Sequence, residues 1–199
     1  FKKLKKLSKR HGIKLADDEV QMGMGRTGNF WSIENFDIDP NTIQVAKSLG
    51  GGVPIGVVIF DGDMDYDRKG RHASTFAGNP IGCAAGIEVV NIIKEYLDHA
   101  KDMGNHLNKR LTELQEKYDV IGDVRGIGLA QAAEFVRDRK TKEPAVKTRD
   151  KIAEEALKNG LLLLGCGESV IRFIPPLTIV EEEIDIAMNI LDESISSVI

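Results

Sequence analysis

The sequence has little cysteine and no long apolar run. Its 199 residues include only two cysteines, Cys83 and Cys166, which lie far apart and outside any C-x-x-C pair. This spacing excludes a disulfide framework and favours a reduced, cytoplasmic setting. No stretch reaches the roughly 18 consecutive apolar residues of a membrane-spanning helix, and no signal peptide is recognisable. We therefore expect no membrane partner.

The chain also has few histidines and no net positive charge. The four histidines are His11, His72, His99 and His106. They show no H-E-x-x-H or similar spacing, so no metal site is expected. The formal net charge is −4, with basic and acidic residues interleaved, which argues against a nucleic-acid partner.

One basic segment, KKLKKLSKRHG, stands at the start of the chain. Phe1, Leu4 and Leu7 recur there at helical spacing, so an amphipathic helix with a solvated basic face is favoured over a phosphate-binding patch. Apolar residues make up 42% of the chain, enough for a globular protein with a sizeable core.

The string GMGRTG at residues 23–28 has the glycine spacing G-x-G-x-x-G of a dinucleotide-binding turn. That fingerprint needs a strand before it, a helix opening at its end and an acidic residue about 20 positions later. Here Asp17, Asp18 and Glu19 precede the turn and would repel a pyrophosphate, and the segment after it contains Pro40 and no helical periodicity. A glycine-loosened loop that carries Asp18 and Gln21 to a site is the better interpretation.

The remaining pattern predicts two domains with a boundary near residue 95. Residues 1–95 have α/β character, with strands expected at 13–17, 42–46 and 55–60, the last of them buried, and a helix starting at Asn79-Pro80. Residues 96–199 predict a smaller α+β unit: a helix over 101–118, strand-like pieces, a helix that stops at Gly160, two more strand-like segments and a final helix from Glu181.

Two residues are candidates for catalysis because each lies at the end of a predicted strand. Lys47 lies between a predicted strand end and a triple-glycine turn, where a lysine could serve as a Schiff-base nucleophile or simply be a surface side chain. Asp18 ends an earlier strand, where it could sustain a protonated pyridine nitrogen or merely cap a loop. Pyridoxal phosphate works as an electron sink when that nitrogen is protonated, so Lys47 and Asp18 are the candidate catalytic pair.

Four segments, in this order along the chain, are specific enough to indicate a protein family: DEVQMGMGRTG, AKSLGGGVPIG, STFAGNP and IRFIPPLTIVEEEID. Together they resemble the class III pyridoxal-phosphate-dependent aminotransferases, which include 4-aminobutyrate, ornithine and acetylornithine aminotransferases. The resemblance spans nearly the whole chain. It implies the type I fold of pyridoxal-phosphate-dependent transferases, with residues 1–95 as the C-terminal part of the large, cofactor-binding domain and its mixed sheet. Residues 96–199 would be the small C-terminal α+β domain.

The resemblance also implies residue roles for the cofactor pyridoxal 5'-phosphate. Lys47 is similar to the lysine that joins the cofactor as an imine and moves the substrate proton, and Asp18 to its ring-nitrogen partner. Gln21 would approach the ring oxygen. Thr75 would bond a phosphate, usually that of the neighbouring subunit, with Ser74 as a weaker candidate.

Arg172 in IRFIPPL matches the arginine that grips the substrate carboxylate, a task suited to its bidentate guanidinium. Purely structural roles also stay open for several of these residues. Gln21 and Thr75 would then stabilise loops, and Arg172 would pair with one of three glutamates: Glu181, Glu182 or Glu183.

The implied activity is transamination from a 4-aminobutyrate- or ornithine-type donor to an oxo acid acceptor. The alternatives are an amino-acid racemase of the same family, using the same lysine, and a non-catalytic half-site. Family members are usually homodimers with the active site at the subunit interface. They are also longer, so we expect this chain to be the C-terminal half of a longer protein, or one whose other part is supplied separately, with an incomplete site by itself.

The segment before Asp18 departs from the family pattern. Lys14 and Asp17 stand where apolar or small residues are usual. A carboxylate beside Asp18 would raise the pKa of one of the pair. We therefore expect Asp17 to point away or to pair with Lys14 or Arg26.

Overall fold

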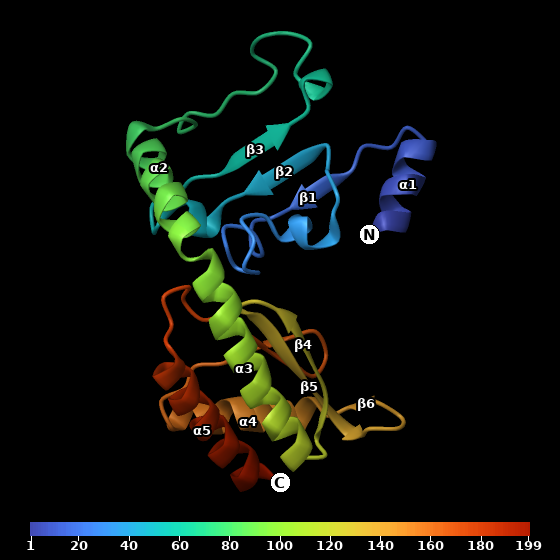
Figure 1. Cartoon of the computed structure of the whole chain (residues 1–199), viewed down its shortest axis with the longest axis vertical. Coiled ribbons are helices and arrows are strands. Elements are labelled where there is room, and N and C mark those ends of the chain that lie inside the picture. The colour runs from blue at the N-terminus through green and yellow to red at the C-terminus, as the bar shows by residue number, and fades with distance from the viewer. The chain divides into compact units, whose positions relative to one another are not determined.

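The structure is a computed structural model that describes residues 1–199. It divides into two compact units, Phe1–Leu97 and Asp98–Ile199, whose elements are labelled in Figure 1. The division falls two residues beyond the expected position, inside the first turn of a helix. Each unit is described by itself.

The first unit is built on a three-stranded sheet in the order β1-β2-β3. Its elements are α1 (Lys2–Arg10), β1 (Ala16–Asp18), β2 (Thr42–Val45), β3 (Val57–Phe60) and α2 (Pro80–Glu95). β1 pairs with β2 in parallel, so that Asp18 lies opposite Gln44, and β3 runs antiparallel to β2 (Figure 1). The carboxyl ends of β1 and β2 therefore meet at one edge of the sheet.

The first strand begins later than the sequence predicted. Residues before Ala16 are held by a loop instead of a ladder: the N–H of Leu15 donates to the Asn41 side chain over 2.9 Å, and the N–H of Asn41 donates to the Leu15 carbonyl over 2.8 Å. Lys14 reaches out of the segment to Asp63, 2.5 Å away. Asn41 thus binds the backbone just before β1, a contact that the apolar pattern of the sequence does not reveal.

The expected burial of the third strand is wrong. Val58 is 55% exposed and Ile59 is 48% exposed, and the other two residues of β3 are also exposed. A run of apolar residues predicts burial only where neighbours cover both faces. Within this chain β3 is an edge strand whose ladder partner is β2 alone.

Helix α2 begins where the sequence predicted. Asn79 is its N-cap, with a side-chain oxygen that accepts the N–H of Gly82 over 2.8 Å, and Pro80 occupies the first helical position. Small residues on one face let the helix approach the segment after β2: a Cβ on Gly86 would lie 3.6 Å from the Leu49 carbonyl oxygen. This contact holds the Lys47 segment against α2.

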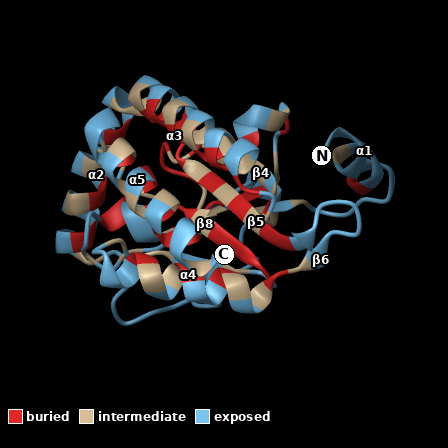
Figure 2. Cartoon of the chain, turned by 90° about the horizontal axis from the view of Figure 1, so that it is seen from below, coloured by how far each residue is buried: buried red, intermediate tan, exposed pale blue.

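The second unit is an antiparallel sheet with three helices. Its elements are α3 (Leu97–Lys117), β4 (Ile121–Ile127), β5 (Ala130–Asp138), β6 (Glu143–Pro144), α4 (Val146–Lys158), β7 (Leu164–Cys166), β8 (Val170–Phe173) and α5 (Glu181–Val198). The strand order is β4-β5-β8-β7, and β6 pairs with the outer part of β5. β5 and β8 are the most buried strands in Figure 2.

The core of the second unit lies between this sheet and its helices. Leu111 of α3, Phe135 of β5, Ile171 of β8 and Leu191 of α5 are all fully buried. The apolar spacing of α3 and α5 explains this, because residues three and four apart share one face of a helix. No helix of the structure is both long and apolar enough to cross a membrane.

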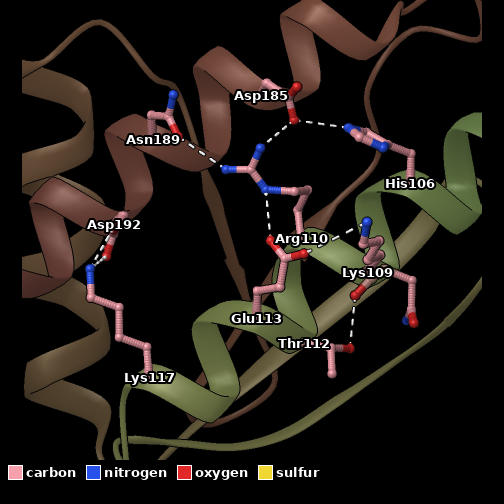
Figure 3. A network of polar contacts seen from close by, with 10 residues as sticks. His106, Lys109, Arg110, Thr112, Glu113, Lys117, Asp185, Asn189 and Asp192 are labelled. Atoms are coloured by element: carbon pink, nitrogen blue, oxygen red, sulfur yellow. Dashed lines mark hydrogen bonds and ion pairs between the residues drawn. The ribbon is translucent and has the colours of Figure 1, made fainter.

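A polar network joins α3 to α5 at the surface of this unit (Figure 3). Asp185 of α5 accepts hydrogen bonds from His106, at 2.9 Å, and from Arg110, both on α3. One turn further along α5, Asn189 accepts a second bond from Arg110 at 3.0 Å. The network links the two helices beside the core that they cover.

Candidate functional site

Lys47 stands two residues after β2, at the start of the short 3-10 helix Lys47–Gly50. Its backbone φ is +43°, a left-handed conformation that is uncommon for a residue with a side chain. Such conformations persist where the surrounding structure enforces them, and they cluster at functional sites. The side chain is exposed, so its amine is accessible to a ligand.

The Lys47 side chain lies on the wall of a pocket of about 760 Å³. The lining residues are Ala46, Lys47, Gly52, Val53, Pro54, Ile55, Gly56, His72, Ser74, Phe76, Ala77, Gly78 and Asn79. The volume is in the range of small-molecule and cofactor sites. Residues from the triple-glycine turn and from the loop before α2 thus form one site with Lys47.

The triple-glycine turn next to Lys47 has no room for side chains at two of its positions. A Cβ on Gly50 would lie 2.9 Å from the Ile55 side chain, and one on Gly51 would lie 2.9 Å from Val89 of α2. Gly51 and Gly52 also have positive φ. The glycines therefore serve close packing and a tight turn beside the pocket.

Asp18 ends β1 at the same sheet edge from which Lys47 emerges. It pairs in register with Gln44, three residues before Lys47 in the chain. One carboxylate oxygen of Asp18 accepts the N–H of Val20 over 3.0 Å, and the side chain stays exposed. The parallel pairing of β1 and β2 thus brings a carboxylate and an amine to one edge, as expected where the ends of parallel strands form a ligand site.

Of the other candidate residues, only Ser74 lines the Lys47 pocket. Gln21 is half-buried in the turn after Asp18. Ser74 lines the Lys47 pocket, whereas its neighbour Thr75 is exposed and lies outside the lining. Arg172 belongs to the second unit, on β8, opposite Ala132 and Leu164.

Arg172 lines a separate, mainly apolar cavity of about 240 Å³ within the second unit. Leu161, Leu163, Phe173 and Ile179 are among the other residues of its wall. Glu183, one of the glutamates considered as a partner for Arg172, accepts the N–H of Val180 over 3.1 Å and so caps α5.

Two residues of the Lys47 pocket were missed by the sequence reasoning. His72 had been considered only as a metal ligand, and Phe76 not at all, yet both line the pocket with Lys47. The ring of His72 stacks on Tyr66, with centroids 5.6 Å apart. Their position in the string GRHASTFAGNP, next to Ser74, was the signal that could have identified them.

Asp17 does not pair with Lys14, because Lys14 binds Asp63 instead. Burial, a hydrogen bond with the Glu19 carboxyl group, and the charges of Glu19 and Asp18 together raise the pKa of Asp17 to about 7. Burial also lowers the pKa of Arg26 in the following loop. The expected effect of a neighbouring carboxylate on the pKa of Asp17 is thus present, and Glu19 contributes more to it than Asp18 does.

The residues at this sheet edge fit the needs of pyridoxal phosphate. The cofactor requires a lysine amine for its aldehyde carbon, a carboxylate for its ring nitrogen and hydrogen-bond donors for its phosphate. Lys47 offers an exposed amine on a pocket wall, Ser74 offers a hydroxyl on the same wall, and Asp18 offers a carboxylate at the same sheet edge.

The comparisons with known proteins agree on one family. A family model described as aminotransferase class-III matches residues 1–195. The leucine/methionine racemase of Thermococcus litoralis is 41% identical to the chain, and the match covers 100% of this chain and 45% of that protein. The 5-aminovalerate aminotransferase DavT of Pseudomonas aeruginosa is also 41% identical, with 97% of this chain and 46% of that protein covered.

Solved structures show the same likeness. An amine transaminase from an uncultivated Pseudomonas species, crystallised in its PLP-bound form, matches with a TM-score of 0.89 and 30% identity, over 98% of this chain and 47% of that chain. The α/β fold of a pyridoxal-phosphate-dependent transferase is thereby confirmed. The chain spans about half the length of the relatives it matches. Since the family model covers nearly all of the chain, the protein belongs to the class III aminotransferases.

Proposed function

We propose that this chain supplies the lysine half of a pyridoxal-phosphate site that transfers an amino group from an amino acid to an oxo acid. The observation that carries the proposal is the position of Lys47, on the wall of a pocket shared with Ser74 and at the sheet edge that Asp18 also occupies. The cofactor, when bound, withdraws electrons from the substrate carbon that carries the amino group. The other half of the site would come from the part of the family's length that this chain does not span.

The residues of the first unit would divide the work. Lys47 would hold the cofactor covalently and then move a proton to and from the substrate carbon, since a free amine on a pocket wall is a suitable general base. Asp18 would keep the ring nitrogen protonated by charge pairing. Gln21 would hydrogen-bond the ring oxygen, and the hydroxyls of Ser74 and Thr75 would serve phosphate binding.

Thr75 lies outside the Lys47 pocket of its own chain, which supports a role toward a second copy. We therefore propose a homodimer in which Thr75 bonds the phosphate in the neighbouring subunit's site. Both cysteines are free thiols, which supports a reduced, cytoplasmic setting.

Arg172 would bind the substrate carboxylate through its planar guanidinium, which matches a carboxylate bidentately. The proposed donor is an amino acid of the 4-aminobutyrate or ornithine type. The likeness to the 5-aminovalerate aminotransferase, at 41% identity, supports a donor with a terminal amine.

A second candidate is amino-acid racemisation, which would use the same lysine and cofactor. It is favoured by one specific observation, the 41% identity to a leucine/methionine racemase over the full length of this chain. The two reactions differ in their products. Formation of an oxo acid from the donor indicates transamination, and loss of optical activity without oxo acid indicates racemisation.

The first test of the proposal is covalent labelling. The full-length protein is incubated with pyridoxal phosphate and reduced with borohydride, and the lysine that carries the phosphopyridoxyl group is mapped by peptide mass. We expect the label at Lys47, and its loss in Lys47→Ala. The exposed Lys69 in the loop before the pocket serves as an internal control. Label scattered over surface lysines, or none, would favour the non-catalytic half-site.

A further inference from the structure

Two carboxyl groups lie on the face of β1 opposite Asp18. Side chains alternate along a strand, so Asp17 and Glu19 point to one face and Asp18 to the other. The N–H of Glu19 still donates to the Gln44 carbonyl over 2.9 Å, which extends the ladder to Glu19. Glu19 is only 1% exposed, and Asp17 is half-buried.

The fold makes room for the Glu19 side chain in two ways. One carboxyl oxygen, Oε1, accepts the N–H of Ile33 over 2.8 Å. The other, Oε2, lies against Gly23, where a Cβ would be 3.0 Å from it. A carboxyl group this deeply buried needs compensation for its lost hydration.

One buried oxygen of each carboxyl group has no hydrogen-bond donor. These are Glu19 Oε2 and Asp17 Oδ2, which are both buried. The two residues lie two positions apart on one face of the strand, and Glu19 contributes to the raised pKa of Asp17. An ionised carboxylate only accepts hydrogen bonds, whereas a protonated one also donates. A hydrogen bond between Asp17 and Glu19 therefore requires a proton between them.

The elements around the pair carry few other charged or titratable groups. β2, which packs beside Asp17, carries no titratable residue between Thr42 and Val45. In the 3-10 segment that faces Glu19, Glu34 accepts the N–H of Trp31 over 3.1 Å. Lys14 is paired with Asp63, and Arg26 stands in the loop after Gly25, where burial lowers its own pKa. On β1 itself the neighbour is the anionic Asp18.

We propose that Asp17 and Glu19 share one proton at mildly acidic pH, as a single monoanionic pair behind the ring-nitrogen aspartate, and that this pair holds Asp18 in place and tunes its charge. Asp17 is in this sense a positioning residue that acts through Asp18. The tuning part of the proposal rests on the proposed function, whereas the shared proton does not.

The electrostatics agree with this geometry. The pKa of Asp17 is raised to about 7 by burial first, then by the Glu19 hydrogen bond and by the charges of Glu19 and Asp18. Because the charge of Asp18 contributes to the shift, the coupling is reciprocal. A cation bound to Asp18 should therefore lower the pKa of Asp17, and ionisation of Asp17 should strengthen the hold of Asp18 on that cation.

The test is infrared spectroscopy of the carboxylic acid C=O band in the full-length protein, recorded across pH. We expect a band from a protonated carboxyl group that persists well above pH 3.8, the ordinary pKa of an aspartate, and disappears near pH 7. Asp17→Asn should abolish the band. Asp37→Asn is the matched control, because Asp37 is exposed and its backbone φ of +54° suits asparagine. Absence of a band at pH 5 to 6 in the unaltered protein would overturn the proposal.

A second variant keeps the test decisive if Asp17→Asn does not fold. Glu19→Gln removes the carboxylate that receives the shared proton, so the midpoint of the Asp17 band should move toward acid. An unchanged midpoint would overturn the pairing with Glu19.

In the last experiment the protein is loaded with pyridoxal phosphate and the infrared pH titration is repeated. The band midpoint should move to lower pH when the cofactor occupies the Lys47 site, and should stay in place in Lys47→Ala treated alike. A fixed midpoint in a labelled protein would overturn the tuning of Asp18. A protein that shows the band but takes no label at Lys47 would instead contradict the proposed function and leave the shared proton supported.

Discussion

Gly104 of α3 lies directly against the backbone of Gly128 in the turn between β4 and β5. A Cβ on Gly104 would be 2.2 Å from the Gly128 carbonyl carbon and 2.4 Å from its oxygen. These atoms are backbone, and Gly128 itself has a φ of +54°, so neither side can yield without moving the turn. The close approach sets the distance between α3 and the sheet in the second unit.

Replacing Gly104 by alanine should therefore destabilise the protein despite the higher helix propensity of alanine. Overpacking of this kind costs about 1–3 kcal/mol of the free energy of unfolding, measurable by urea denaturation. Asn105→Ala is the matched control, because Asn105 is the next residue of α3 and is exposed. Equal stability of the two variants would show that the contact relaxes without cost.

Arg149 of α4 connects its helix to the turn between β7 and β8. Its guanidinium, buried in the second unit, donates to the carbonyl oxygens of Val170 over 2.9 Å and Glu168 over 3.3 Å. Arg149→Met should cost about 1–3 kcal/mol of unfolding free energy, because carbonyl groups that lose a buried donor are left unsatisfied.

The control for Arg149 is another arginine of the same unit. Arg137→Met removes an ion pair to Glu143 whose side chains are 61% and 55% exposed, and such pairs contribute little. A loss in Arg137→Met as large as in Arg149→Met would contradict the assigned role of the buried hydrogen bonds.

Much of the local structure followed from the sequence because its signals are local. The start of α2 is encoded by Asn79 and Pro80, and the start of α5 by three consecutive glutamates in its first turn. Lys47 and Asp18 were identified by position and by resemblance, and their roles stay predictions. The parallel pairing of β1 and β2 gives those predictions a common location.

The failures of the sequence reasoning concern contacts between distant residues. Lys14 was one of two cations considered as a partner for Asp17, but it binds Asp63, 49 positions away. The exposure of β3 depends on which elements of the fold cover it, and the apolar run in the sequence does not reveal those elements. The positive φ of Lys47 is likewise not a preference of lysine itself, and it occurs directly before the buried residues Leu49 and Gly50.

The N-cap of α2 gives a prediction that touches both stability and the pocket. Asn79→Ala removes the acceptor for the Gly82 N–H and should cost about 1 kcal/mol of unfolding free energy. Asn79→Asp keeps an oxygen in the same place and should retain the stability. Thermal unfolding of the three proteins checks this, and a loss of equal size in both variants would point to the pocket wall, not to the cap.

The two hydroxyls before α2 should differ in their effect on cofactor binding. If Thr75 bonds a phosphate, Thr75→Val should weaken pyridoxal phosphate binding about tenfold, the equivalent of one charge-assisted hydrogen bond. Thr75→Ser retains the hydroxyl and should bind normally. Fluorescence titration of the full-length protein measures both, alongside Ser74→Ala, whose hydroxyl lines the Lys47 pocket. Normal affinity in Thr75→Val would assign the phosphate to other donors.

Acid stability should depend on the link between α3 and α5 shown in Figure 3. The hydrogen bond from His106, followed by the charge of Arg110, lowers the pKa of Asp185 below its usual 3.8. A carboxyl group with a lowered pKa stabilises the folded state above its unfolded-state pKa, and this contribution is lost as the pH falls through the folded-state value. Asp185→Asn should therefore show a flatter dependence of unfolding free energy on pH below 3.8, and should be less stable than the unaltered protein at neutral pH.

Asp102→Asn is the control, because Asp102 is exposed on α3 and makes no ion pair. If both variants lose the same stability on acidification, Asp185 contributes no more than an isolated surface carboxylate.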